Sequence, residues 1–396
     1  MKKSRKLFWI TVIVLLQAVS LIGCWNRQEL SSLGLVMALA IDQAPEKNKV
    51  SITVQLANPR EVKQPSKTGG GGTKPVWVAT NTGYSFSDAL RNFVSISGRK
   101  LFYAHNQVIV IGEEAARKGV RPFMDFLSRN YQIRRTSWVV VAKGVKGARI
   151  LQFQSEMEKV PAMEISSLIK AKVDASTAAG IDIHDFIEKL TGDGIEPIAG
   201  GIELTNRTQP EGGEAGKDKN EVSLTGTAVF KEDKLVGWLN KPETRGLLWI
   251  LGQVNRGIIV VESPKDIKKP VALEITRASG AVAPEFRNGK LVIKIKIKEE
   301  GNLGENMSEV DVTRPGVIKT LEDEQKKVIE NEIRAALKKA QKEFKTDIFG
   351  FGASVSRNYP NEWNKIKSRW SGMYPDLAVE LDVATKIRQQ GMVSSW

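Results

Sequence analysis

The sequence predicts an α+β (mixed α/β) protein of several domains, with mixed sheets covered by helices. Strand and helix patterns alternate through the first half of the chain. In the second half, two long alternating strands meet at Asn288-Gly289, a dipeptide typical of two-residue β-hairpin turns. A long helix with one apolar stripe follows them. We therefore expect the C-terminal domain to combine a long helix with an antiparallel sheet.

Composition indicates where the domains meet. Residues 205–221 are rich in glycine, charged and amide side chains and contain no aliphatic or aromatic residue larger than alanine, which favours a linker. We expect a lipoprotein signal peptide at 1–23, an N-terminal α/β domain at 24–149, a mainly helical subdomain at 150–204, the linker at 205–221 and a C-terminal α+β domain at 222–396.

Local patterns place the elements of the first half. An apolar run extends from Leu33 to Ile41, and apolar residues then alternate with polar ones as in a strand. Gly98 and Gly119 act as helix stops, and Pro122 stands in the first turn of a helix. Strands are expected within 49–59, 76–80, 106–112 and 136–144, and helices within 85–98, 113–119, 121–130, 147–154, 161–171 and 180–194. The last three helices either form a lobe of their own or cover the first sheet.

In the second half, residues 222–240 predict a hairpin that turns at Lys231–Lys234. A short helix at 244–254 and a strand at 257–264 precede the long hairpin within 269–300. The long helix runs from about Leu321 to Thr346, and a strand at 376–391 closes the fold. The helix stripe consists of Ile329, Ile333, Leu337, Ala340 and Phe344.

The last strand of the long hairpin has two contrasting faces. One carries Leu291, Ile293, Ile295 and Ile297, and the other carries Lys294, Lys296 and Lys298. This pattern is typical of a sheet with one buried and one solvated face. The alternative is a basic docking face for lipid headgroups or for an acidic partner.

The N-terminus has the three parts of a secretory signal peptide. Four basic residues precede an apolar run, and the segment ends in Leu21-Ile22-Gly23-Cys24. From Leu7 to Gly23 there are 17 residues, polar ones among them. A membrane-spanning helix needs about 20 apolar residues. A retained membrane anchor is therefore the weaker interpretation.

The end of this segment resembles a bacterial lipobox, in which cleavage falls just before an invariant cysteine. The resemblance implies that Cys24, the one cysteine in the chain, becomes the first mature residue and carries a thioether-linked diacylglycerol. An additional N-acyl group stays open. Two acyl chains hold a protein at a membrane where one holds it only marginally. The alternative is a buried free cysteine at the end of an uncleaved helix. Apart from the lipid we expect no cofactor.

The charge balance fits a membrane surface. The whole chain has 59 Lys and Arg against 45 Asp and Glu, and the first 23 residues hold four of the basic ones and no acidic one. The mature chain therefore carries 55 against 45, or +10. Such an excess suits a protein close to anionic headgroups. Nucleic acid is the rival partner, but export and the lack of a nucleic-acid-binding motif exclude it.

Motifs for catalysis or metal binding are missing from the sequence. His105 and His184 have no His or Cys partner at ligand spacing, which argues against a zinc site. The sequence contains no Gly-x-Ser-x-Gly elbow, and Gly69–Gly72 lacks the ending of a phosphate-binding loop. Scattered carboxylates leave a glycosidase-type pair open. We expect a binding or assembly protein without enzymatic activity, with no catalytic, cofactor-binding or metal-binding residues.

Several stretches, in this order, resemble the spore germination receptor C-subunit lipoproteins, the GerAC-type or Ger(x)C family. They are CWNRQEL after the signal, GRKLFYAHNQVIVIGEEAARKGVRPFMDFLSRN, LTGTAVFKEDKLVGWLN, DIFGFG, a following tryptophan and VELDVATKIRQQG. The resemblance covers essentially all of the mature chain. Its specificity comes from the order and spacing of the stretches, since no single motif is diagnostic.

The resemblance implies a subunit of a nutrient germinant receptor in the inner membrane of a bacterial endospore. In such a receptor the A subunit combines a soluble part with a membrane part, and the B subunit is an integral membrane protein similar to amino-acid transporters. The C subunit is a lipoprotein on the outer leaflet, with a role in receptor assembly and germinant response. Two other functions stay open: a lipid-anchored solute-binding protein that captures the nutrient itself, and a hydrolase acting on the cortex or wall.

Overall fold

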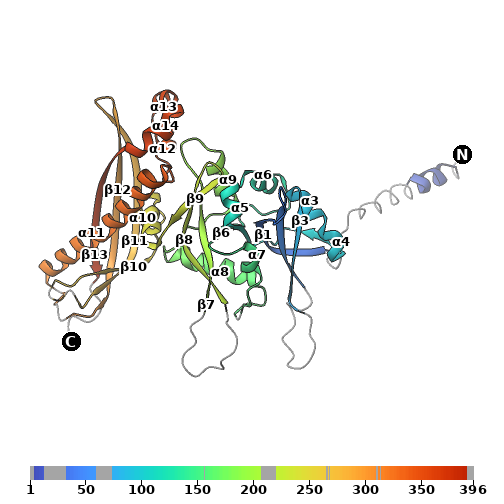
Figure 1. Cartoon of the computed structure of the whole chain (residues 1–396), viewed down its shortest axis with the longest axis horizontal. Coiled ribbons are helices and arrows are strands. Elements are labelled where there is room, and N and C mark those ends of the chain that lie inside the picture. The colour runs from blue at the N-terminus through green and yellow to red at the C-terminus, as the bar shows by residue number, and fades with distance from the viewer. Residues whose placement is uncertain are drawn as a thin grey trace, which may run out of the picture.

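The computed structural model describes residues 4–12, 33–58, 74–155, 157–206, 220–264, 266, 268–308, 311–312 and 314–389. Two sheets follow one another along the chain, each with its own helices (Figure 1). Within the described residues the first sheet has nine strands and the second has four. The predicted class, a mixed α/β protein with mixed sheets covered by helices, is confirmed.

The first sheet has a parallel centre between antiparallel flanks. Its order is β3-β2-β1-β5-β6-β7-β8-β9, and β4 pairs with the start of β1. The central strands β1, β5, β6 and β7 run parallel, so both of their faces are covered and all five residues of β5 are buried. The strands are β1 (Leu33–Gln43), β2 (Val50–Ala57), β3 (Val76–Gly83), β4 (Lys100–Phe102), β5 (Val108–Gly112), β6 (Trp138–Ala142), β7 (Ile198–Asn206), β8 (Asn220–Lys231) and β9 (Lys234–Leu239).

Helices pack on both faces of this sheet. On one face lie α3 (Phe86–Arg91), α4 (Phe93–Ser97), α5 (Glu113–Lys118), α6 (Arg121–Arg129) and α9 (Ile183–Thr191). On the other lie α7 (Gly147–Leu151) and α8 (Pro161–Asp174). The helix expected within 85–98 is divided at Asn92 into α3 and α4, and it ends at Gly98, whose φ is 60°. The helices expected between 147 and 194 cover the sheet.

The structure differs from the expected domain boundaries in two places. Residues 150–204, expected as a mainly helical subdomain, end in β7, an inner strand of the first sheet, so they are part of the first module and not a separate subdomain. The expected linker at 205–221 joins β7 to β8, which pair as a hairpin through Thr205 with Glu221. The chain passes to the second sheet only between β9 and β10. A polar, glycine-rich segment can be a hairpin loop or a linker, and composition alone does not separate the two.

The second sheet has the order β10-β11-β12-β13. The long hairpin is confirmed, because β11 and β12 pair antiparallel around Asn288 and Gly289, both with positive φ. We expected an antiparallel sheet, but β13 runs parallel to β12. A parallel neighbour requires a long crossover, which the helices between these strands provide. The strands are β10 (Gly257–Val261), β11 (Val271–Arg287), β12 (Lys290–Asn306) and β13 (Ala378–Gln389).

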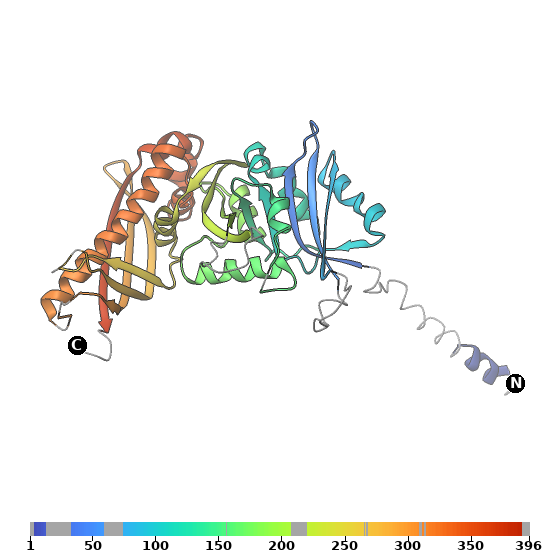
Figure 2. The ribbon, with the colours of Figure 1, turned by 60° about the horizontal axis from the view of Figure 1, so that its bottom comes forward.

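The helices of the second module lie over one face of its sheet, as Figures 1 and 2 show for the long helix α11. Ile293, Ile295 and Ile297 of β12 share one hydrophobic cluster with Ile329 and Ile333 of α11. The long helix continues as a short π-helix, η3, in place of the expected α-helix up to Thr346. The helical elements are α10 (Lys241–Leu251), α11 (Pro315–Lys338), η3 (Lys339–Phe344), α12 (Phe351–Asn358), α13 (Pro360–Ile366), η4 (Lys367–Arg369), α14 (Trp370–Met373) and η5 (Tyr374–Asp376).

The two modules give the molecule two distinct ends. In both views α4 and the start of β1 lie at one end, and the second sheet lies at the opposite end (Figures 1 and 2). The parallel centre of the first sheet, α9 and the hairpin β8-β9 lie between them.

Candidate docking surface and module junction

The predicted lipidation residue, Cys24, lies outside the described residues, so the lipid anchor stays a prediction. Residues 4–12 of the signal segment are helical. Among the helices that the structure describes, none is long and apolar enough to cross a membrane.

The two histidines lie far apart in the fold. His105 lies in the turn between β4 and β5, with its ring 6.0 Å from that of Phe102. His184 lies on α9, where its possible ligand atoms and those of Asp185 and Glu188 are within 4.8 Å of one another. Burial raises the pKa of Asp185, and the neighbouring Asp182 raises it further. The group is exposed, and exposed acidic clusters are common without a metal, so we assign it no ion.

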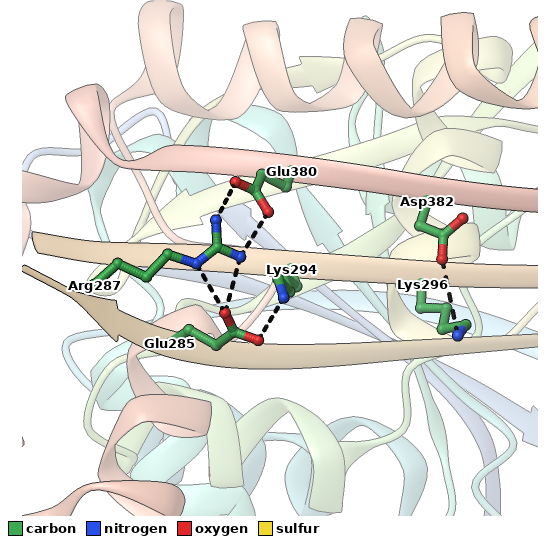
Figure 3. A network of polar contacts seen from close by, with 6 residues as sticks. All are labelled: Glu285, Arg287, Lys294, Lys296, Glu380 and Asp382. Carbon is green, nitrogen blue, oxygen red and sulfur yellow. Dashed lines mark hydrogen bonds and ion pairs between the residues drawn. The ribbon is translucent and has the colours of Figure 1, made fainter.

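The lysine row of β12 lies on the outer face of the second sheet, opposite the helices. Lys294 contacts Glu285 of β11 at 2.6 Å, and Lys296 lies 3.8 Å from Asp382 of β13. Arg287, at the end of β11, donates to both oxygens of Glu380 at 2.7 and 3.1 Å and also donates to Glu285 (Figure 3). Four of these six side chains therefore form one network across three strands, and Lys296 and Asp382 form a separate pair beside it (Figure 3).

Strand register also places opposite charges side by side on β12 and β13. In the parallel pair, Lys294 lies opposite Glu380, Lys296 opposite Asp382 and Glu300 opposite Lys386. A shift of two residues toward the C-terminal end of β13 would place Lys298 beside Lys386, so the charges disfavour that alternative register. Hydrogen bonds from Lys294 and Arg287 lower the pKa of Glu285, and those to Glu380 and Glu285 raise the pKa of Arg287.

The paired charges help to decide whether the lysine row is a solvated sheet face or a basic docking face. A basic docking face needs cations that are free to meet an anionic partner, but Lys294 and Lys296 face acidic side chains on neighbouring strands. The arrangement fits a solvated sheet face whose charges match strand to strand. Any partner that docks there meets a surface of mixed charge.

The DIFGFG stretch forms a buried polar centre at the junction of the two modules. One oxygen of Asp347 accepts hydrogen bonds from the backbone N–H groups of Phe349, Gly350 and Phe351, at 2.9 to 3.2 Å. The other accepts from the N–H of Gly352 at 2.8 Å and from the indole N–H of Trp370 at 3.1 Å. Burial raises the pKa of Asp347 to about 6, and these hydrogen bonds oppose the increase.

Glycines let the two modules approach closely at this centre. A Cβ atom on Gly352 would lie 2.7 Å from the Cα of Gly194, in the loop after α9. The backbone N–H of Ala353 donates to the carbonyl of Gly194 at 2.9 Å, and that of Glu196 donates to the carbonyl of Asp347 at 2.8 Å. The junction is therefore tied by backbone hydrogen bonds as well as by side-chain packing.

A hollow of about 250 Å³ opens beside the junction. Lys189, Glu196, Lys231 and Lys345 line it, together with Asp347. Burial lowers the pKa of Lys189 and raises that of Glu196. Both oxygens of Asp347 are already engaged by five donors, which fits a structural carboxylate better than one member of a glycosidase-type pair.

Sequence reasoning gave the DIFGFG stretch and the following tryptophan no physical role. The informative signal was present: an acidic residue just before alternating glycines at the start of a helix, where free N–H groups need acceptors. The contact with Gly194 could not be predicted, because Gly352 follows it 158 positions later in the chain.

Comparison with known families agrees with this architecture. Residues 26–204 match the model described as the spore germination protein N-terminal domain. Residues 225–391 match the model described as spore germination B3/GerAC like, C-terminal. The two models cover most of the chain, which belongs to the GerAC-type family of spore germination proteins. Their boundary lies close to the β7-β8 loop, so the hairpin β8-β9 belongs to the second model although it pairs in the first sheet.

Full-length relatives support the assignment. Spore germination protein KC of Bacillus subtilis strain 168 is 29% identical over 392 residues, which cover 97% of this chain and 96% of that protein. Spore germination protein B3 of the same strain is 26% identical, with 96% of this chain and 97% of that protein covered. The crystal structure of the GerBC protein has the same fold, with a TM-score of 0.52 and 22% identity over 88% of this chain and 96% of that one.

Proposed function

We propose that this protein is the lipid-anchored C subunit of a nutrient germinant receptor in the endospore inner membrane. Its role is receptor assembly and germinant response, through docking to the integral-membrane A and B subunits. The observation that carries the proposal is the match of both family models, in order, together with relatives named as spore germination proteins that align over nearly the whole chain.

The proposed anchor is the diacylglycerol on Cys24, at the outer face of the membrane. The first core residue of the described body, Leu33, follows nine positions later. A chain of nine residues spans at most about 30 Å. A body held this close to the bilayer has a high effective concentration toward membrane-embedded partners, which favours docking without requiring strong contacts.

A docking role without catalysis is supported by the hydrogen bonds of two buried carboxylates. Asp347 organises a loop, and the carboxylate of Glu332 on α11 accepts hydrogen bonds from Arg245 and Trp249 of α10. Both carboxylates hold elements of the fold together and have their donors inside the protein.

The hollow at the junction is the observation that favours the rival function, direct capture of a nutrient. Its size suits a small polar molecule, and both signs of charge line it. Capture by closure of two lobes requires a hinge, whereas backbone hydrogen bonds join the two modules here. We therefore expect isothermal titration of residues 25–396 with amino acids and sugars to give no micromolar binding. Such binding would favour the capture hypothesis.

The proposal is tested by replacing the anchor residue in spores. Cys24→Ala is expected to leave the body folded and to reduce nutrient-triggered germination strongly, because the subunit is no longer held at the membrane. Germination is followed by loss of optical density, with protein level measured by immunoblot and membrane association by fractionation. Ser31→Ala, seven residues further on, is the control and is expected to germinate normally. Normal germination by Cys24→Ala at normal protein level would contradict the proposal.

A further inference from the structure

Basic and apolar side chains gather at the end of the molecule where the N-terminal segment enters the first sheet. Trp77 of β3 and Ile96 of α4 are 40% and 54% exposed, and exposed apolar side chains that lie together can mark an interaction site. Both line a hollow of about 540 Å³ together with Lys74 and Arg99. Lys100, the first residue of β4, follows Arg99 directly and pairs with Leu33 at the start of β1, and it lines a separate hollow that also contains Tyr84. We call Lys74, Trp77, Ile96, Arg99 and Lys100 the anchor-end patch.

The cations of this patch differ from Lys294 and Lys296 of the second sheet, which face acidic side chains. Within the described residues, no ion pair is formed by Lys74, Arg99 or Lys100, and all three side chains are exposed. The sequence around them is strongly segregated in charge, since residues 62–112 contain six basic residues and a single acidic one, Asp88. An anionic surface would meet these cations without having to displace an acidic partner.

The position of the patch identifies its partner. Gly34, the second residue of β1, lines the same hollow. The chain between the proposed lipid on Cys24 and Leu33 is at most about 30 Å long. Both views place this end of the molecule away from the second sheet (Figures 1 and 2). Tryptophan and aliphatic side chains beside lysine and arginine are the composition that lies at the headgroup level of a bilayer.

We propose that the anchor-end patch lies against the membrane and binds the headgroups of anionic phospholipids. This inference rests on the proposed lipid anchor for its geometry, and it adds an orientation: the first module contacts the bilayer and the second sheet points away from it. The outer face of the second sheet is then presented to partners above the membrane.

The test uses residues 25–396, which contain both hydrophobic clusters in full and lack the lipid. Co-sedimentation is measured with vesicles of phosphatidylcholine, with and without phosphatidylglycerol. We expect binding only to the phosphatidylglycerol vesicles. The variant Lys74→Gln/Arg99→Gln/Lys100→Gln is expected to bind about 100-fold more weakly, because each basic residue near an anionic surface contributes roughly 1 kcal/mol.

The matched control removes the same charge from the far end of the molecule. Lys294→Gln/Lys296→Gln/Lys298→Gln is expected to bind the phosphatidylglycerol vesicles about as well as the unmodified body. Melting curves check that both triple variants are folded. Equal weakening of the two variants would show attraction by net charge alone and overturn the proposal, as would an unmodified body that binds neither vesicle.

The orientation is tested separately with spin labels. Residues 25–396 contain no cysteine, so a nitroxide can be attached to Ile96→Cys or, as a control, to the exposed Met307→Cys after β12. With phosphatidylglycerol vesicles, the label at 96 is expected to lose access to an aqueous relaxant and to gain access to oxygen, while the label at 307 changes little. A label at 96 that stays aqueous on bound protein would overturn the proposal.

These outcomes are separate from those of the anchor experiment, because the body lacks Cys24 and no receptor subunit is present. A patch that fails to bind vesicles, but whose triple variant reduces germination in spores with an intact Cys24, would be a protein interface in place of a lipid-binding surface. The proposed function would then stand and the membrane inference would fall.

Discussion

The module junction and the outer face of the second sheet both hold dense networks of carboxylates, but they differ in what surrounds each network. Asp347 at the junction is 4% exposed and accepts five hydrogen bonds from a loop and an indole. Glu380 on the sheet face accepts two hydrogen bonds from Arg287, and water reaches both side chains. Water can replace the donors of the exposed carboxylate but cannot reach those of the buried one.

Access of water therefore decides how much a polar residue contributes to the stability of the fold. Removing a buried partner leaves donors without acceptors, which costs the full desolvation of each group. Removing an exposed partner exposes the other group to water, and the fold changes little. The DIFGFG stretch and Trp370 therefore have their strongest physical role in holding the two modules together.

The largest effect is expected at the glycine that lets the modules meet. In Gly352→Ala the new Cβ would lie 2.7 Å from the Cα of Gly194 and 2.8 Å from the indole nitrogen of Trp370. Backbone must move to make room, and the free energy of unfolding is expected to fall by about 3 kcal/mol. Urea denaturation followed by tryptophan fluorescence measures this change.

The matched control is Gly372→Ala, in helix α14. A Cβ there would meet no atom within 4 Å, and alanine favours a helix over glycine, so stability is expected to stay the same or rise slightly. Equal urea midpoints for Gly352→Ala and Gly372→Ala would mean that the junction can move to accommodate the added methyl group. The junction would then be no more sensitive to substitution than the sheet face.

The sequence predicted the parts of the fold that depend on local chemistry. Asn288 and Gly289 adopt the positive φ that their hairpin turn requires, and Gly98 ends α4 in the same way. These signals need only neighbouring residues. The parallel pairing of β13 could not be predicted, because it depends on where α11 returns the chain after more than 70 residues.

Functional surfaces were harder to predict for the same reason. The lysines of β12 are a clear pattern in sequence, but their acidic partners come from other strands: Glu285 of β11 contacts Lys294, and Asp382 of β13 lies beside Lys296. The anchor-end patch could be predicted only in part. Its charge segregation between residues 62 and 112 is visible in the sequence, but Trp77 and Ile96 become part of one surface only after β3 and α4 are folded together.

Glu299 is another buried carboxylate. It lies on the same strand as Lys294 but faces inward. It is 1% exposed, and burial raises its pKa from the ordinary 4.5 to about 8. Between these values the folded protein keeps a proton that the unfolded chain has released. Stability is therefore fully present below about pH 4.5 and falls as the pH rises to about 8. The variant Glu299→Gln cannot ionise and is expected to escape this loss.

Melting temperatures measured from pH 5 to pH 9 test this expectation. The advantage of Glu299→Gln over the unmodified protein is expected to grow with pH, reaching on the order of 5 °C at the alkaline end. Its neighbour Glu300 supplies the control: it faces solvent, where a hydrogen bond from Arg388 lowers its pKa. The difference between Glu300→Gln and the unmodified protein is expected to be constant over this range. If the difference in melting temperature between Glu299→Gln and the unmodified protein did not change with pH, the carboxylate of Glu299 would already be in contact with water in the folded protein.

The smallest effect is expected on the sheet face itself. Glu380→Gln removes the negative charge and one of the two oxygens that accept hydrogen bonds from Arg287, which keeps its contact with Glu285. Because water solvates the freed guanidinium, the melting temperature is expected to fall by no more than about 2 °C, and by less at high salt. A double-mutant cycle with Arg287→Gln isolates the pair from other effects of each change. A coupling as large as the loss in Gly352→Ala would mean that this face is shielded from water, and that its charges contribute to the fold as the junction does.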